Sequence, residues 1–302
     1  MEITQLVVIG LINGSVYALL SVGFGLILQV TGRFHIAFAI TYALAGYAAA
    51  YTTTQFGLNF WVALVLGALV ATALGVAVEA FVYWPLGPRA GNFALLAIFT
   101  ASLGLLTLGQ AGLGLVLINS GTAQVSGYLI APINVGEIFF TNLDLLTVIV
   151  CWVLVAVAAL VMVRTKLGRM VRAVRSNVTM SLAVGVSPRA IFMIIFGIGS
   201  FFGGVGGVLA ATKSAVASDS GQHAILYALT IAFLAGMKSS PARIALVALG
   251  LGIIESVANL WVSPVWDPVI VYGLLLVYAA LKPFDLATRI RALRRPQIAL
   301  EP

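Results

Sequence analysis

The chain has 302 residues, of which 62% are hydrophobic and 8% are charged, and its formal net charge is +7 at pH 7. Soluble domains carry roughly 25% charged residues, so this composition excludes an ordinary soluble protein and indicates an all-α, polytopic transmembrane bundle. The positive charge lies in segments between or after apolar runs, so it does not indicate binding to nucleic acid. We expect one transmembrane domain that covers residues 1–302.

Apolar runs long enough to cross a bilayer recur along the chain, since a membrane helix needs about 20 residues. The predicted spans are residues 6–30, 34–54, 60–84, 93–118, 143–163, 190–211, 244–262 and 268–281. We expect the third span to break at Pro85, and residues 119–142 to form a polar connection. The apolar run at 224–237 is short for a span, which indicates a tilted, broken or re-entrant helix. The sequence therefore predicts about eight or nine spans.

The distribution of basic residues predicts how these spans are oriented. Six of the 16 lysine and arginine residues fall in residues 164–190: Arg164, Lys166, Arg169, Arg172, Arg175 and Arg189. If this segment is cytoplasmic and the spans alternate, every lysine and arginine except Lys213 lies on the cytoplasmic side. The N-terminus is then outside, and the basic tail at 282–302 is inside.

The segment at 164–190 is longer than a connection between two spans requires. Arg169, Arg172 and Arg175 recur every three residues, so they would lie near one face of a short helix. Two interpretations stay open, namely charge that only fixes the orientation, or a docking element for a cytosolic partner. The length of the segment favours the docking element.

Two carboxylates, Glu79 and Glu255, fall inside predicted spans, where an ionisable residue is a functional hypothesis by default. Glu79 lies near the inner end of its span and close to Arg89, which favours an interfacial pairing or a helix-end contact. Glu255 is deeper and forms a polar stripe with Asn259 at helical spacing. That stripe could line a pathway or hold helices together.

The sequence contains no recognisable motif for nucleotide binding, catalysis or metal binding. There is no GxxxxGK[ST] phosphate loop, so we do not expect this chain to bind ATP itself. No nucleophile motif or acid–base pair indicates an enzyme, and two histidines with one cysteine are too few for a metal site of ordinary ligand count. Proton-coupled carriers usually embed charged relays in their spans, and this sequence has only two candidates. We therefore expect no catalytic site, no metal and no cofactor, and a pore driven by another subunit.

Four blocks of the sequence resemble the inner-membrane permease subunits of branched-chain amino acid ABC importers. They are residues 10–19 (GLINGSVYAL), Glu79 with Pro85-Leu86 and residues 100–104, residues 168–210, and residues 252–255. The third block is the most specific, because it matches the coupling loop through which such permeases engage their ATPase. Residues 34–40 depart from the family pattern after the first span, which leaves room for a different or less polar cargo.

The resemblance implies a permease subunit of an ATP-driven importer in the inner (plasma) membrane. Its cargo would be a branched-chain or hydrophobic amino acid, or a related small organic solute. Its partners would be a second, related permease chain in a heterodimer, two cytosolic ATPase subunits that carry the ATP, and a periplasmic or extracellular substrate-binding protein, within membrane lipid. The residues that would couple it to the ATPase are Gly168, Arg169, Arg172, Ala183 and Gly185.

The translocation pathway has only weak signals in the sequence. Polar and aromatic positions within the predicted spans are candidates to line it: Asn13, Ser15, Tyr17, Tyr42, Glu255 and Asn259. The same residue types also serve helix packing, so each of these positions has two interpretations. The alternative to an importer subunit is a stand-alone secondary carrier or channel for a small solute.

Overall fold

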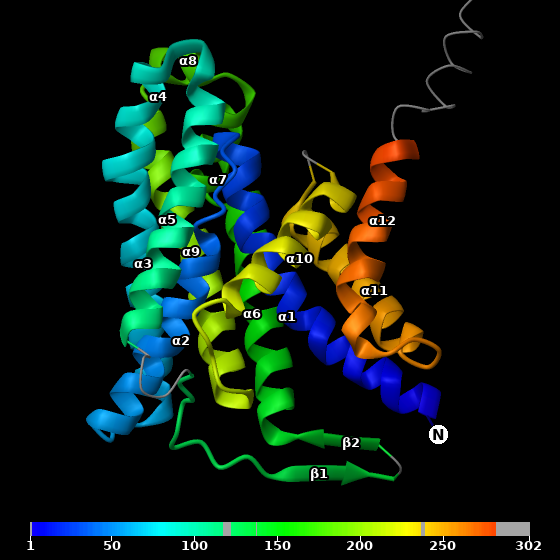
Figure 1. Ribbon diagram of the computed structural model, residues 1–302. Helices are drawn as coiled ribbons and strands as arrows, with labels where there is room; N and C mark the ends of the chain where they lie inside the picture. Colours follow the sequence, from blue (N-terminus) through cyan, green and yellow to red (C-terminus); the bar gives the residue numbers. More distant parts are fainter. Residues whose placement is uncertain (1, 117–121, 137, 237–238, 282–302) are drawn as a thin grey trace, which may run out of the picture.

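The computed structural model describes residues 2–116, 122–136, 138–236 and 239–281, and most of these residues are helical (Figure 1). The α-helices are α1 (Glu2–Thr31), α2 (Phe38–Gln55), α3 (Phe60–Ala77), α4 (Trp84–Ala90), α5 (Ala94–Val116), α6 (Asn142–Arg164), α7 (Lys166–Ser176), α8 (Val178–Ala183), α9 (Pro188–Lys213), α10 (Ser220–Ala235), α11 (Pro241–Ala258) and α12 (Asp267–Leu281). A π-helical segment (Val78–Tyr83) joins α3 to α4, and 3-10 turns precede α5 (Gly91–Phe93) and α12 (Pro264–Trp266).

The apolar helices make this a multi-pass membrane protein, as the sequence predicts. Within the described residues, five segments are long and apolar enough to cross a membrane: Ile3–Thr31, Phe60–Val116, Asn142–Arg164, Pro188–Lys213 and Pro241–Ala258. The shorter apolar helices are Ser220–Ala235 and Asp267–Ala280. Residues 224–235 of the run expected to be tilted, broken or re-entrant lie in one continuous helix, α10, while residue 236 follows it and residue 237 lies outside the described residues. The count of eight or nine spans stays a prediction.

Three local expectations differ from the structure. The third span does not break at Pro85, because that proline lies in the first turn of α4, where its missing N–H is not needed. The helical run turns instead at Gly91, whose φ of 53° favours glycine. The polar connection contains a β-hairpin, formed by β1 (Pro132–Val135) and β2 (Ile138–Thr141). The second span starts later than expected: residues 32–37 are not helical, and the helix begins at Phe38.

Side-chain caps explain where several helices begin. Thr141 and Asp144 form a reciprocal capping box at the start of α6. Asn59 caps α3 by accepting from the backbone N–H of Trp61, and Ser240 caps α11 ahead of Pro241. These residues satisfy backbone N–H groups that have no partner within a helix, so the connections between the apolar runs also define the ends of the helices.

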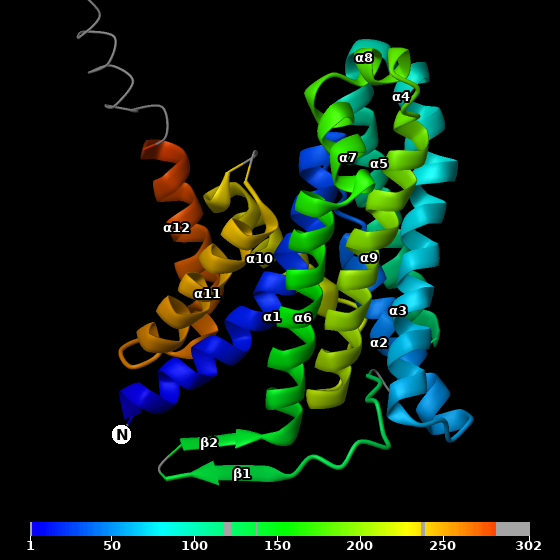
Figure 2. The same cartoon turned by 180° about the vertical axis from the view of Figure 1, so that it is seen from behind.

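Helix α1 runs obliquely between two groups of helices, as Figures 1 and 2 show. On one side lie α2, α3 and α9, which pack closely on one another, and on the other lie α10, α11 and α12. The most extensive contact of α1 is with α11. Helices α4 and α8 lie at one end of the molecule, while the N-terminus and the hairpin lie at the opposite end.

The hairpin is attached to the first turns of α1. The Gln5 side chain donates from Nε2 to the carbonyl oxygen of Phe139 at 2.8 Å and accepts from the backbone N–H of Phe139 at 2.9 Å. The Gln5 side chain thereby pairs with both the N–H and the carbonyl group of Phe139 in strand β2.

Close contact between helix backbones holds α9 in the centre of its group. A Cβ atom at Gly204 would lie 2.6 Å from the Cβ of Ala71 on α3, which is closer than any real side-chain contact. Gly203, the residue before Gly204, lies close to the ring of Phe38 on α2 in the same way. The GxxxG pattern of Gly203 and Gly207 therefore serves tight packing, as its spacing predicts.

Candidate functional site

Helix α7 folds back against the inner bundle immediately after α6. Thr165 caps it by accepting from the backbone N–H of Gly168, and Gly168, Val171 and Val174 are buried along its inner face. Gly168 packs against the backbone of Met162, and the Arg172 guanidinium donates to the Met162 carbonyl oxygen. Helix α7 also contacts α1. The predicted coupling residues Gly168 and Arg172 thus attach α7 to the bundle, while Arg169 is exposed.

Helix α8 is a short helix of six residues at the end of the molecule opposite the N-terminus (Figure 1). Asn177 caps its start by accepting from the backbone N–H of Met180 at 3.0 Å. Its end is a Schellman motif, in which Val186 N–H donates to the Ser181 carbonyl at 2.9 Å and Gly185 N–H donates to the Leu182 carbonyl at 3.0 Å. Gly185 has a φ of 78°, so the motif depends on glycine at this position.

The outward side of this turn is apolar and exposed. Met180, Leu182 and Val184 are 65%, 60% and 71% exposed, and Ala183 is also exposed. We call Met180, Leu182, Ala183 and Val184 the α8 surface. Exposed apolar side chains grouped in this way, with arginines nearby on α7, indicate a protein contact. Ala183 was predicted from the sequence, whereas Met180, Leu182 and Val184 were not. These three apolar residues alternate with other residues outside any predicted span, and this pattern was the signal that could have identified them.

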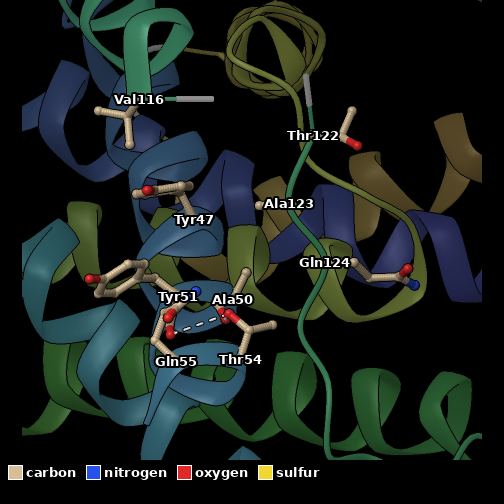
Figure 3. Close-up of a pocket in the computed structure, with 9 residues that line it drawn as sticks. All are labelled: Tyr47, Ala50, Tyr51, Thr54, Gln55, Val116, Thr122, Ala123 and Gln124. Atoms are coloured by element: carbon tan, nitrogen blue, oxygen red, sulfur yellow. Dashed lines mark hydrogen bonds between the residues drawn. The ribbon is translucent and has the colours of Figure 1, made fainter. Parts of the chain in front are cut away.

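A second feature is a groove between α2 and α5. Near the hairpin end, a cavity of about 420 Å³ is lined by α2, the end of α5 and the extended chain at 122–124: Tyr47, Ala50, Tyr51, Thr54, Gln55, Val116, Thr122, Ala123 and Gln124 (Figure 3). An apolar cavity of about 540 Å³ adjoins it and shares Tyr47 and Val116. Its other walls include Leu44, Leu105 and Leu113. We call the two together the α2–α5 groove.

The rim of this groove is polar and aromatic. The rings of Tyr47 and Tyr51 stack with their centroids 6.2 Å apart, and Figure 3 shows both on the α2 side, across from the chain at 122–124. Neither tyrosine was predicted as a site residue, although their spacing of four residues puts them on one face of a helix, with Thr54 close to the same face. The groove has the size of a small-molecule site and joins an apolar interior to a polar rim.

The sequence matches, over residues 6–280, the family described as branched-chain amino acid transport system / permease component. The chain belongs to this family. The permease is 24% identical over 301 residues to the high-affinity branched-chain amino acid transport system permease protein BraD of Pseudomonas aeruginosa, covering 94% of this chain and 95% of BraD. It is also 24% identical over 246 residues to the fructose import permease protein FruF of Bifidobacterium longum, covering 78% of this chain and 64% of FruF.

A solved structure shares the fold of the permease. PsaBC from Streptococcus pneumoniae, in complex with Fab, matches with a TM-score of 0.51 over 92% of this chain and 91% of that chain. The sequence identity is 15%, so the likeness concerns the fold alone.

The six predicted pathway residues of the permease do not all lie together. Ser15 accepts from Trp152 Nε1 at 3.1 Å and so faces α6, whereas Tyr42 is buried beside Gly206 of α9. Asn13 lines a cavity near the hairpin with Phe139 and Lys213. None of the six predicted residues lines the α2–α5 groove as described above. Their assignment to a pathway stays a prediction.

Tyr17, Glu255 and Asn259 do form one cluster, where α1, α10 and α11 meet. Glu255 is 5% exposed, and its Oε1 accepts from Tyr17 Oη at 3.2 Å and from Tyr227 Oη at 3.0 Å. The rings of Tyr17 and Tyr227 lie 4.8 Å apart. The polar stripe that the sequence predicts along α11 therefore faces other helices of the same chain.

Glu79 has a different partner from the one its sequence position suggests. It forms a buried ion pair with Arg33, while Arg89 donates to the carbonyl oxygen of Pro85. Arg33 lies in the non-helical residues 32–37, which turn inward after α1, and its guanidinium sits 5.0 Å from the ring centroid of Phe192. The expected contact with Arg89 was wrong, because the inward turn brings Arg33 next to the π-helical segment.

A hydrogen-bond network holds the same inward turn. His35 is fully buried, and its Nδ1 lies 3.0 Å from Tyr83 Oη, which donates to Ser102 Oγ at 2.7 Å. Ser102 Oγ also accepts from the backbone N–H of Ala37 at 2.8 Å. The network ties the turn to the π-helical segment and to α5, so His35 serves structure.

We expect Glu79→Leu to destabilise the permease by about 3–5 kcal/mol, because it leaves the Arg33 charge buried without a partner. The double variant Arg33→Met with Glu79→Leu should recover much of that loss, because both charges are then gone. Thermal unfolding of the purified protein in detergent measures both effects. A double variant less stable than Glu79→Leu alone would contradict the ion-pair account.

Proposed function

We propose that this permease is the membrane-spanning subunit of an ATP-driven importer, and that a separate ATPase docks on the α8 surface and α7. The observation that carries the proposal is the exposed apolar α8 surface beside exposed Arg169. An isolated membrane protein gains nothing from apolar side chains in water, whereas a docked partner buries them. The proposed coupling segment is residues 164–190, within one transmembrane domain.

The proposed topology has nine crossings, with the N-terminus outside and α8 in the cytoplasm. Gly91 divides the long segment Phe60–Val116 into two passes, and α8 lies at the end opposite the N-terminus. Lys213 is the one basic residue that this topology puts outside, and it forms an ion pair with Asp144 at 2.6 Å. Lys213 is therefore the single exception to the positive-inside rule in this topology, and its charge is paired. The tail at 282–302 and Lys238, both assigned to the cytoplasm, lie outside the described residues.

The proposed assembly follows from the missing phosphate loop and from the relatives. A second, related permease chain would complete the pore, two cytosolic ATPases would bind ATP, and a periplasmic or extracellular binding protein would deliver cargo. The assembly would reside in the inner membrane. BraD, similar over nearly its full length, is named as a permease of a high-affinity branched-chain amino acid system.

The proposed cargo is a branched-chain or other hydrophobic amino acid, or a related small organic solute. Apolar walls next to a polar rim in the α2–α5 groove suit a molecule with an apolar side chain and a polar end. The similarity to a fructose import permease shows that relatives at this level of identity differ in cargo. Uptake of labelled solutes by the intact assembly therefore decides the cargo.

The docking proposal predicts that Leu182→Asp removes the ATPase from the purified permease. A carboxylate in the centre of an apolar contact costs at least about 1.4 kcal/mol, which is a tenfold loss of affinity. The measurement is the amount of ATPase that copurifies with the full-length chain after expression with its partner genes.

The matched control is Leu129→Asp, which changes a residue that is 85% exposed in the chain leading to β1. This variant should retain the ATPase, because the hairpin lies at the opposite end of the molecule. Equal retention in both variants would count against docking on the α8 surface.

A further inference from the structure

The inner faces of α1, α10, α11 and α12 enclose a group of polar side chains that we call the Glu255 cluster: Tyr17, Tyr227, Glu255, Asn259, Asp267 and Tyr272. Asp267 is close enough to act electrostatically on Glu255 and on both Tyr17 and Tyr227. The end of α11 and the start of α12 lie toward the N-terminal end of the molecule (Figure 1). Exposed Trp261 and Trp266 flank this region, as is typical of a membrane–water interface.

The hydrogen bonds of the cluster leave acceptors without donors. Glu255 Oε1 has two tyrosine donors, and Asn259 Nδ2 donates to Asp267 Oδ2 at 3.5 Å. Glu255 Oε2, Asn259 Oδ1 and Asp267 Oδ1 are buried and have no hydrogen-bond partner among the described residues. All three are acceptors, whereas the buried Tyr272 hydroxyl is the one group of the cluster whose donor has no partner in the described part of the chain, so the unpaired acceptors outnumber the unpaired donors.

The cluster also lacks positive charge. Among the residues that the structure describes, the ion pairs of lysine and arginine are with Glu79 and Asp144, and none is with Glu255 or Asp267. Glu255 Oε2 and Asp267 Oδ1 have no donor within the described ranges, and an unpaired buried acceptor is costly, so a further donor would stabilise the cluster. A single proton on Glu255 together with the Tyr272 hydroxyl would supply two donors for the three unpaired acceptors.

A primary ammonium group carries one positive charge and three N–H donors, which matches the three free acceptors in number and the carboxylates in sign. We propose that the Glu255 cluster binds an ammonium group. Two sources present this chemistry at the outer half of the bundle: the amino group of an amino acid cargo, and the headgroup of phosphatidylethanolamine. The cargo source rests on the proposed import function, whereas the lipid source does not.

The test measures the thermal unfolding of the full-length chain in detergent with four probes. L-leucine and 3-methylbutylamine carry a primary ammonium, 4-methylpentanoate carries only the carboxylate, and trimethyl(3-methylbutyl)ammonium carries the charge without N–H donors. We expect the two primary amines to stabilise the wild-type chain, and the other two probes to have little effect. Phosphatidylethanolamine and phosphatidylcholine nanodiscs form the lipid arm, because only the first headgroup has N–H donors.

Two variants connect these effects to the cluster. Glu255→Gln and Asp267→Asn should each raise the amine concentration for half-maximal stabilisation about tenfold, since each removes one charge-assisted hydrogen bond. Should Glu255→Gln fail to accumulate, Asp267→Asn carries the test. Asp219→Asn removes an exposed carboxylate near the start of α10 and should respond as the wild type does.

Each result decides the proposal. Stabilisation by the soluble amines that depends on Glu255 or Asp267 supports it with cargo as the source, and dependence seen only with phosphatidylethanolamine supports it with lipid as the source. Stabilisation that both variants keep, an equal effect of the quaternary probe, or no effect of any amine or headgroup overturns it. ATPase copurification, measured on the same proteins, reports on the import function separately, because the cluster lies far from α8 (Figure 1).

Discussion

Replacing Gly185 with valine should uncouple ATP hydrolysis from transport in the reconstituted assembly. A residue with a side chain at a φ of 78° costs about 1–2 kcal/mol, and more for a β-branched one. The Schellman motif would open, and the α8 surface would lose its fixed position on α9. We expect the number of solute molecules moved per ATP hydrolysed to fall at least about tenfold, which corresponds to roughly 1.4 kcal/mol.

Gly57 provides the matched control for this substitution. It has a φ of 61° with open space around it, as Gly185 has, but it lies between α2 and α3 near the other end of the molecule. Gly57→Val carries a similar backbone cost and should keep its coupling. Ala183→Phe adds bulk to the α8 surface without changing φ and should uncouple as Gly185→Val does. If vesicles with Gly185→Val and Gly57→Val transport equally well per ATP, the coupling role of the segment is wrong.

The second large effect concerns the crossing of α1 and α11. A Cβ atom at Gly252 would lie 2.6 Å from the carbonyl oxygen of Gly10 and 2.6 Å from the Cα of Gly14. Both neighbours are backbone atoms, so no side chain can rotate away, and the two helices must separate. We expect Gly252→Val to destabilise the permease by about 3 kcal/mol or more and to abolish the folded fraction after detergent extraction.

Gly250 lies two residues earlier on the same helix, with no atom within 4 Å of an added Cβ. Gly250→Val makes the same change in helix propensity, in which valine ranks above glycine, and should leave the yield of monodisperse protein close to that of the wild type. Size-exclusion chromatography and thermal unfolding of both variants make the comparison. Similar losses for the two would mean that a property shared by both substitutions, and not the close crossing, determines the effect.

The positions of the helices follow largely from the sequence, because apolar length and caps are local properties. The inward turn at Arg33 does not, since it depends on Glu79, which is 46 residues away. The end of the third predicted span was wrong for a related reason. The π-helical segment before Pro85 lets the chain continue as a helix, and single-residue preferences do not predict such a segment.

The candidate sites were predicted in outline only. Residues 164–190 were recognised, but which side chains of α7 and α8 are exposed depends on how α7 packs on α1 and α6. Ser15 and Tyr17 illustrate the difficulty with the pathway. They are two positions apart, which is about 200° around a helix, so they face α6 and α10–α11 respectively. Sequence proximity therefore did not imply a shared lining.

Helix α1 is one continuous helix of 30 residues, roughly 45 Å along its axis, and contains no proline. Near one end it contacts α7, and near the other its Gln5 is bound to β2. Under the proposed function, a movement of α7 caused by the docked ATPase would tilt α1, and the hairpin bound to α1 would move with it. The hairpin end of the permease and the end that carries the α8 surface would then move together.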